Sequence, residues 1–525
     1  MRRLLLIASF WAAAASAMSA QTPADASPSI LRLTVDDAVK MARDHNVDLA
    51  AERIDPQIGD TRVAAAAGAF LPSFTSSVQR NNQLEPPTGF LVPAATRTDV
   101  VTSNVGVKQT LPRFGTSYNV SWNAAHTDSN SFLSNYNPIL QAGLSLNVSQ
   151  PLLRDLAVDS ARQQLSTSRV DRDIADTRLR ESLVRTTADV KRAYWNLVSA
   201  ISTVAARRSV LQAAQELVRV NTVKVDVGQS PPLDLVAAQA EVAADQEQLI
   251  IAETAVSDIE DELRTLIFDT TDRSVWTVRI EPVDSPPLAA ASPDLDAAIT
   301  AALRDRADLA RVRKDIEQAE LTVKFSRNQQ LPDVRVNASY VASGLGGTQL
   351  LRAGAFPGTI VGPGAATGFG SVLSQLLTSD YPTWTVGLSV NYPLGQGTER
   401  ANHARATLER QQAEQRMKSA ESRAVQQLRD AWRKIEMNAR RIETARAARE
   451  LADRRLDAER KRFDVGISTS FLVIQAQRDM AQARTGELAA ILAYDLALVD
   501  FDALQQAGPA GSSGADSARQ TVRER

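Results

Sequence analysis

The chain has 525 residues and a formal net charge of −2, with 59 Lys and Arg against 61 Asp and Glu. This balance provides no electrostatic attraction to nucleic acid, and the absence of cysteine excludes disulfides, thiolate metal sites and thiol nucleophiles. The three histidines are far apart, so we expect neither a metal site nor a cofactor. Aromatic residues make up only 5% of the chain, which favours an extended helical assembly over several compact cores.

The first residues have the pattern of a secretory signal peptide. Arg2 and Arg3 form a short basic region, residues 4–14 are apolar, and small residues at 15–17 suit a cleavage site. The apolar run is shorter than the ~20 residues that a membrane-spanning helix needs. We therefore expect residues 1–20 to be a signal peptide and the mature chain to lie in a bacterial envelope.

The rest of the chain repeats itself. An offset of 260 residues aligns Leu33–Pro72 with Pro293–Pro332, and an offset of 238 aligns Lys224–Gly228 with Arg462–Gly466. Two collinear blocks at similar offsets indicate a tandem duplication. The expected segments are a first repeat at 33–290 (strands at about 72–150, helical hairpin at about 155–268), a second repeat at 293–505 (strands at about 332–393, helical hairpin at about 398–504) and a disordered tail at 506–525.

Each repeat opens with a predicted helix, over residues 35–69 in the first and 295–329 in the second. Both are closed by a Leu-Pro pair, Leu71-Pro72 and Leu331-Pro332. Because proline cannot continue a helix and makes its predecessor extended, these pairs predict helix-to-strand junctions. Pro56 lies inside the first helix and should kink or split it.

Strands are expected next, because apolar and small polar residues alternate, as in Trp384–Tyr392. A soluble β-sandwich, in which one face of each sheet is exposed to water, would show the same alternation of apolar and polar residues. The polar faces are Ser, Thr, Asn and Gly with few charges, however, and segments of about ten residues suit a barrel in a membrane. Residues 343–381 are expected to be a loop rich in Gly, Pro and Ser. The first repeat offers four such segments, 72–80, 100–111, 116–126 and 139–150.

Long helices are predicted over about 159–225 and 398–464, where proline is absent. Each has one narrow apolar seam with steps of three and four residues, which is typical of coiled coils. Short turns at Val227–Ser230 and Val465–Ser468 then lead to returning helices. Glycine at the end of each long helix and serine before each returning helix match capping preferences.

This combination resembles the TolC-like outer-membrane efflux proteins: signal peptide, duplicated helix–strands–hairpin plan, Leu-Pro junctions, Gln150-Pro151-Leu152 and paired Val-Gly turns. The resemblance implies a mainly α fold with a membrane β-barrel portion. In it, a homotrimer closes one β-barrel in outer-membrane lipid of a Gram-negative bacterium, and the helices form an α-barrel in the periplasm. It further implies the channel component of a tripartite efflux or type I secretion system, a passive duct opened at its tip by a periplasmic adaptor and an inner-membrane pump.

The resemblance also implies site residues at the turns. Expected adaptor contacts at the periplasmic tip are Val227, Gly228, Ser230, Val465, Gly466 and Ser468. Candidate gate residues are Asp234, Leu472 and Gln475. The family pattern has acidic residues at these positions, and here only Asp234 is acidic. The carboxylate of Asp234 is equally well explained by its favourable position at the N-terminal end of the returning helix, where the helix dipole attracts negative charge.

The family pattern has two strands in each half, whereas the first half here offers four. Either the barrel has additional strands or the hairpin around Pro112–Gly115 lies outside it.

Two other classes of protein are alternatives to an outer-membrane channel. A periplasmic coiled-coil adaptor has one hairpin where this chain has two, and an enzyme would need a nucleophile, metal or phosphate pattern that the sequence lacks.

Overall fold

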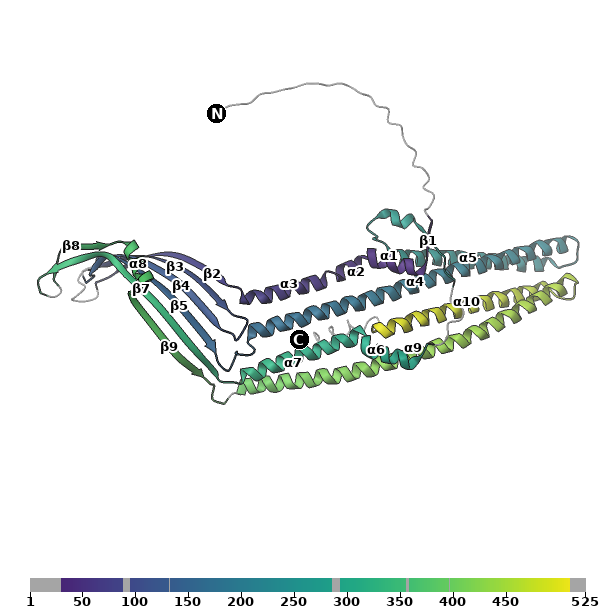
Figure 1. Cartoon of the computed structure of the whole chain (residues 1–525). Helices are drawn as coiled ribbons and strands as arrows, with labels where there is room; N and C mark the ends of the chain where they lie inside the picture. Colours follow the sequence, from purple (N-terminus) through teal and green to yellow (C-terminus); the bar gives the residue numbers. More distant parts are fainter. Residues whose placement is uncertain are drawn as a thin grey trace, which may run out of the picture. The chain divides into compact units, whose positions relative to one another are not determined.

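The computed structural model describes residues 30–87, 95–131, 133–285, 293–355, 358–395 and 397–509. The expected signal peptide and the expected tail beyond Pro509 lie outside these residues. The chain forms two compact units (Figure 1). Unit 1 comprises residues 1–47, 186–291 and 435–499, and unit 2 comprises residues 48–185, 292–434 and 500–525.

Unit 1 is built from helices and one small sheet. β1 (Ile30–Leu33) pairs in parallel with β6 (Arg279–Pro282), next to α1 (Val35–His45) and the short helix η2 (Arg273–Thr277). Two helical hairpins make up the rest of the unit. They are the C-terminal part of α4 (Ser160–Asp226) with α5 (Pro232–Ile267), and the C-terminal part of α9 (Gly397–Asp464) with α10 (Ser470–Gln506).

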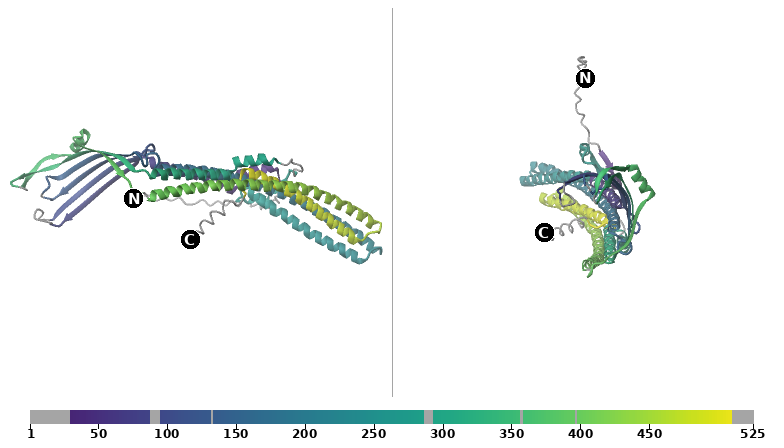
Figure 2. Two further views of the ribbon diagram at one scale, coloured as in Figure 1. Left: turned by 90° about the horizontal axis from the view of Figure 1, so that it is seen from below. Right: turned by 90° about the vertical axis from the view of Figure 1, so that its left-hand side faces the viewer.

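Unit 2 contains a curled antiparallel sheet (Figure 2). Its strands follow the order β2-β3-β4-β5-β7, after which β7 pairs with β9 along its first half and with β8 along its second half. The bounds are β2 Ser73–Glu85, β3 Thr96–Thr110, β4 Ser117–Ser129, β5 Tyr136–Pro151, β7 Asp333–Ala353, β8 Thr359–Thr367 and β9 Tyr381–Asn391.

All four strand segments of the first repeat therefore join one sheet, and the Pro112–Gly115 turn connects β3 to β4 within it. The prediction of a loop over residues 343–381 is wrong. This stretch contains the end of β7, then β8, then the helix α8 (Phe369–Thr378). Five glycines in β7 and β8 made the region look irregular, although four of them allow close packing against α8 or neighbouring strands.

The sheet has one polar and one apolar face. One row of directly opposed residues crosses six strands with polar side chains: Ser73, Lys108, Asn119, Asn147, Ser339 and Thr385. The next row crosses the same strands with apolar ones: Phe74, Val107, Val120, Leu146, Tyr340 and Trp384. Because successive side chains of a strand point to opposite faces, the alternation seen in the sequence separates these two surfaces.

The sequence predicted one helix at the start of each repeat, and the structure shows a broken helix in both places. In the first repeat α1 ends at His45, α2 (Val47–Glu52) follows, and α3 (Asp55–Ala67) begins with Pro56 in its first turn. Pro56 thus splits the helix as predicted. In the second repeat α6 (Leu295–Asp305) and α7 (Ala307–Gln329) meet at Arg306, a break that no proline signals. The 3-10 turn η1 (Gly68–Phe70) follows α3.

The breaks occupy equivalent places in the two repeats. Asn46 and Arg306 are separated by the 260-residue offset, and Leu266 and Leu504 by the 238-residue offset. Asn46 donates its side-chain amide to the carbonyl of Leu266 at 3.0 Å, and Arg306 donates to the carbonyl of Leu504 at 3.4 Å. Each repeat therefore ties its helix break to the end of its own returning helix.

No helix of 18 or more residues within the described ranges contains a stretch apolar enough to cross a membrane.

Candidate functional site

The two turns between the helices of the hairpins, which we call the tip turns, have the same backbone design. Gly228 has a φ of +69° and Gly466 a φ of +77°, values that residues with a Cβ rarely adopt. In the first turn the amides of Gln229 and Ser230 donate to the carbonyl of Lys224, at 2.7 and 3.2 Å. In the second, the amides of Ile467 and Ser468 donate to the carbonyl of Arg462, at 2.8 and 3.2 Å.

These hydrogen bonds satisfy the last carbonyls of α4 and α9, as a glycine-terminated helix requires. The serines play a different part from the one predicted. The residue that caps α5 is Pro231, without a side-chain hydrogen bond, and the hydroxyl of Ser468 donates back to Glu459 at 2.8 Å. Val227 and Val465 lie beside the glycines and are exposed. The six expected contact residues thus lie on or next to two solvent-facing turns.

Within unit 1 the two hairpins are joined just before the tip turns. A buried apolar cluster of Leu217, Ala238, Phe463, Val473 and Ile474 includes residues of all four helices. Three polar contacts surround it, which we call the hairpin clasp: Asn221 with Ser470, Lys224 with Phe463, and Glu241 with Arg478.

The Asn221 contact is fully buried. Its side-chain amide donates to the hydroxyl of Ser470 at 2.7 Å and to the backbone carbonyl of Asp234 at 3.3 Å. Lys224 donates its ammonium to the carbonyl of Phe463 at 3.0 Å and lies 3.4 Å from the centre of the same ring. Since a cation over an aromatic face is attracted by the ring quadrupole, one side chain binds Phe463 in two ways.

The third clasp contact is ionic. The guanidinium of Arg478 donates to both carboxylate oxygens of Glu241, with Nε at 2.8 and 3.0 Å. The Glu241 side chain is buried, whereas that of Arg478 is largely exposed. Hydrogen bonding to Glu241 raises the pKa of Arg478 above its ordinary value. Because a buried carboxylate that loses its charge partner is destabilising, this pair opposes a separation of the two hairpins that leaves Glu241 buried.

The three predicted gate residues have different surroundings. Asp234 is half-buried in the first turn of α5, its backbone joins the clasp through Asn221, and its carboxylate has no hydrogen-bond or ion-pair partner among the described residues. Leu472 is exposed on α10. Gln475 is half-buried and donates to Asp479 on its own helix at 3.0 Å. The structure brings only Asp234 to the clasp.

The clasp residues themselves were not predicted. Lys224 and Phe463 lie inside the repeated blocks Lys224–Gly228 and Arg462–Gly466. The duplication therefore identifies these two segments but does not predict that the two residues contact each other. An asparagine within an apolar coiled-coil seam is the signal that could have identified Asn221, because such a residue fixes the pairing of helices.

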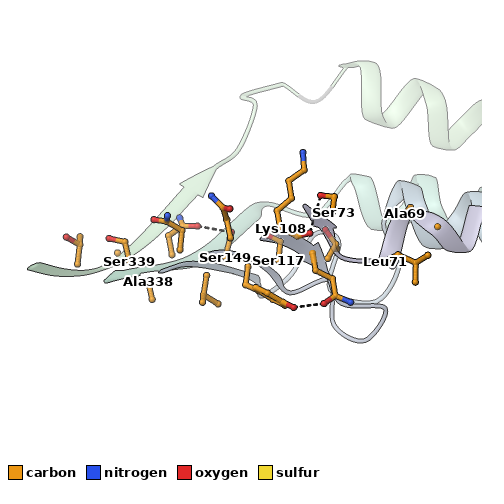
Figure 3. A pocket seen from close by; sticks show the side chains of 18 residues that line it. Ala69, Leu71, Ser73, Lys108, Ser117, Ser149, Ala338 and Ser339 are labelled. Atoms are coloured by element: carbon orange, nitrogen blue, oxygen red, sulfur yellow. Dashed lines mark hydrogen bonds between the residues drawn. The ribbon is translucent and has the colours of Figure 1, made fainter. Parts of the chain in front are cut away.

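The second candidate surface is the concave polar face of the sheet in unit 2. A hollow of about 770 Å³ lies over it, lined mainly by small polar residues of six strands, among them Lys108, Ser117, Ser149 and Ser339 (Figure 3). Some side chains there bond to one another, as Ser149 does to Asn337 at 2.8 Å. A surface of short polar groups with one lysine suits water and passing solutes better than one tightly held ligand.

The opposite face of the sheet is apolar and open. The side chains of Phe74, Trp384, Val386, Leu388 and Val390 are all about two-thirds exposed or more. A monomeric soluble protein rarely leaves so large an apolar area uncovered.

Comparison with known proteins agrees with this geometry. The sequence profile described as "Outer membrane efflux protein" matches residues 91–267 and 298–505. No curated protein matches the chain in sequence.

Several solved structures share the fold. A membrane protein from Pseudomonas aeruginosa is 15% identical with a TM-score of 0.64, covering 90% of this chain and 92% of its own. The CmeC outer membrane channel of Campylobacter jejuni is 15% identical with a TM-score of 0.61, covering 93% and 88%. CusC, described as forming a transmembrane channel, is 14% identical with a TM-score of 0.65, covering 90% and 92%.

These likenesses confirm the predicted fold, mainly helical with a curled sheet. The matched profile describes efflux proteins of the outer membrane, which are transport components without catalytic activity, so the prediction that the chain is not an enzyme is confirmed. Because the profile matches well over half of its residues, the chain belongs to the outer membrane efflux protein family, the TolC-like channels of the outer membrane.

Proposed function

We propose that three copies of this chain form the passive exit duct of a tripartite efflux or type I secretion system. In this arrangement the sheet lies in the outer membrane, the helices lie in the periplasm, and the tip turns meet a periplasmic adaptor coupled to an inner-membrane pump. The observation that carries the proposal is the separation of one polar and one apolar row across the same six strands.

Lipid requires that every backbone polar group be paired inside the protein, so an open sheet cannot remain in a membrane. Within the described chain β2 pairs only with β3, and β9 pairs only with β7. The six strands alternate in direction, so β9 of one copy runs antiparallel to β2 of the next. Three copies would close eighteen strands into one barrel, with the polar face around the pore and the apolar face toward lipid.

In this proposal the chain catalyses no step of transport, and the short polar side chains that line the hollow suit passing solutes. The pump therefore supplies the energy, and the duct supplies a water-filled path with an entrance that opens and closes. The hairpin clasp is the element that holds the entrance closed. Asp234 lies in the first turn of α5, before Glu241, and Leu472 and Gln475 lie on α10 between the clasp residues Ser470 and Arg478. These three residues are proposed to face the narrowest part of the path.

The tip turns are the proposed adaptor contact. Val227, Gly228 and Ser230 form one half, and Val465, Gly466 and Ser468 the other. The exposed valines give each turn an apolar contact point, and the backbone hydrogen bonds described above keep both turns rigid. A rigid, apolar turn loses little conformational entropy on docking.

The absence of cysteine permits a direct test of barrel closure. Ser77→Cys on β2 is combined in turn with Thr383→Cys, Thr385→Cys or Gly387→Cys on β9, all on the polar face, to cover the possible registers. Mild oxidation of purified outer membranes should produce covalent dimers and trimers for at least one pair, because opposed strand residues lie within disulfide distance. Ser77→Cys with Val386→Cys, on the opposite face of β9, is the matched control.

An assembled oligomer that gives no cross-link with any of the three pairs would exclude closure through these edges. The passive mechanism is tested on the same preparation in planar bilayers, where it requires ohmic conductance without ATP or a proton gradient. Recovery of the chain from the soluble periplasmic fraction would instead support the adaptor alternative.

Docking is tested in cells with Val227→Glu and Val465→Glu together. Both side chains are exposed, so the oligomer should assemble normally, while the charges should prevent an apolar adaptor contact and abolish efflux. Ile250→Glu, on an exposed position of α5, is the control and should leave efflux intact. Normal drug tolerance in the double variant would overturn the assignment of the tip turns.

A further inference from the structure

The helix α8 lies between β8 and β9 in sequence and packs against the apolar face of the sheet. Val372 and Leu376 are its buried residues, and they contact Ala142 of β5 and Ala342 of β7. Trp122, Ala124 and Leu140 pack around the same cluster. The outer wall of the sheet therefore carries a helix, seated where the strands present small side chains.

Two glycines make this close seat possible. A Cβ on Gly344 would lie 2.5 Å from the carbonyl oxygen of Val372, and a Cβ on Gly346 would lie 2.5 Å from its Cγ2. Both distances are far below van der Waals contact, so α8 rests on bare strand backbone. The helix is thus a fixed part of the wall.

α8 also covers a gap in strand pairing. β9 pairs with β7 as far as Ser343, and β8 pairs with β7 from Gly347 onward, which leaves Leu345 between them. The side chain of Gln375 fills this gap. Its Oε1 accepts the amide of Leu345 at 3.0 Å, and its Nε2 donates to the carbonyl of Leu345 at 3.2 Å. Satisfying both groups matters most where water is absent.

The outward side of α8 is apolar as well. Phe369, Leu373 and Leu377 follow one another at four-residue spacing, and the Leu377 side chain is 86% exposed. No charged residue occurs in the helix. A surface helix facing water normally carries charge on its outer face, whereas the polar residues of α8 are only serine, glutamine and threonine.

A small hollow adjoins the helix on the same face. It has a volume of about 340 Å³ and is lined chiefly by Val101, Trp122, Leu140 and Phe369, with Ser103 and His126 as its polar members. The exposed apolar belt of the strands continues from it. The hollow is therefore open and mainly apolar, on a surface that already requires an apolar solvent.

We propose that α8 is a membrane-embedded helix on the outside of the barrel, with its Phe369–Leu373–Leu377 stripe in contact with lipid acyl chains and the adjoining hollow occupied by one such chain. The inference rests on the proposed placement of the sheet in a membrane. Lipid is the occupant because α8 lies on the face of the sheet, over the apolar belt, whereas a second copy of the chain would meet the free edges β2 and β9.

Single-cysteine variants of the full-length chain test the inference. Leu377→Cys and Leu373→Cys carry an environment-sensitive fluorophore on α8. Val386→Cys marks the apolar face of the sheet, and Ser77→Cys marks the polar face. Each oligomer is reconstituted into vesicles of phosphatidylcholine with brominated acyl chains, and quenching by the bromine atoms is compared with quenching by aqueous iodide.

The labels at Leu373 and Leu377 should lose fluorescence in brominated lipid and be shielded from iodide, as the Val386 label should. The label at Ser77, on the polar face, should be quenched by iodide and unaffected by brominated lipid. Iodide quenching at Leu377 together with lipid quenching at Val386 would overturn the role of α8 alone. Iodide quenching without lipid quenching at Val386 would overturn the membrane placement of the sheet, and with it the proposed function.

Discussion

Trp432 donates its indole N–H to the backbone carbonyl of Pro293 at 3.2 Å. In the other repeat, at the same two offsets in sequence, Tyr194 donates its hydroxyl to the carbonyl of Leu33 at 3.0 Å. Each contact ties the middle of a long helix to the segment that leads into the first helix of its repeat. Different aromatic side chains thus preserve one hydrogen bond in both halves.

The Tyr194 contact should contribute measurably to stability. Its oxygen also accepts the amide of Asp284 at 3.1 Å, and burial raises the pKa of Tyr194 to about 12, so the group remains a neutral donor at physiological pH. Tyr194→Phe should lower the free energy of unfolding by about 1–3 kcal/mol, because the amide of Asp284 loses its partner and the carbonyl of Leu33 keeps only the amide of Val283. Thermal unfolding by circular dichroism measures this, with Tyr392→Phe as the exposed control.

The clasp should control the entrance. Arg478→Met leaves the buried carboxylate of Glu241 without its charge partner, so the joined state of the hairpins should be destabilised relative to the separated one. We expect a higher open probability in planar bilayers. Arg208→Met removes an exposed ion pair with Glu253 inside the first hairpin and is the matched control. Equal conductance in both variants would argue against a gating role for the pair.

Arg306 should be the most sensitive of the helix-break residues. It is 1% exposed, forms two 2.9 Å hydrogen bonds with Asp308, and reaches Gln427 at 2.8 Å. Arg306→Met should cost about 3 kcal/mol of unfolding free energy, because Asp308 then lies uncompensated.

Arg304→Met provides the comparison for Arg306, since Arg304 forms an exposed pair with Asp305 and should change stability by about 0.5 kcal/mol or less. Adding Asp308→Leu to Arg306→Met should restore part of the loss. A double variant as unstable as the single one would show that the uncompensated charge is not the cause.

Asp495 should make stability depend on pH. It is 2% exposed on α10, and burial raises its pKa to about 7. Between about pH 4 and pH 7 the folded chain keeps this proton while the unfolded chain releases it, so stability falls as pH rises through that window. Asp495→Asn should abolish this slope. It should be more stable than the native chain by up to about 4 kcal/mol above pH 7 and nearly equal to it below pH 4.

Melting temperatures of the detergent-solubilised oligomer at pH 4, 6 and 8 measure this effect. Asp500→Asn, a half-buried carboxylate on the same helix, provides the comparison. A native chain whose melting temperature does not fall between pH 4 and pH 8 would contradict the argument.

The sequence predicted the elements that depend on local patterns. The long helices begin and end within one residue of expectation, because Asp226 and Asp464 are each followed by a positive-φ glycine within two residues. Pro56 also predicted a helix break correctly, because proline cannot continue a helix and favours its first turn. The tip turns were found in the same way, since glycine there is required by backbone conformation.

Features that depend on tertiary contact were missed. The break at Arg306 follows from a buried guanidinium with partners on two other helices, and no local pattern encodes that. Val372 and Leu376 of α8 have helical spacing, but the surrounding glycines are typical of a loop. Only the tertiary structure shows that Gly344 and Gly346 make room for the helix. The clasp likewise joins residues more than 200 positions apart.

The hairpin formed by β3 and β4 has a consequence for how such channels vary in width. Its two strands run in opposite directions, so a protomer has an even number of strands with or without it. In both cases the last strand of one copy is antiparallel to the first strand of the next, and the barrel can close. The circumference of the barrel can therefore change in steps of one hairpin per protomer while both repeats keep their helices. Since barrel diameter scales roughly with strand number, six strands per copy in place of four would widen the bore by about half.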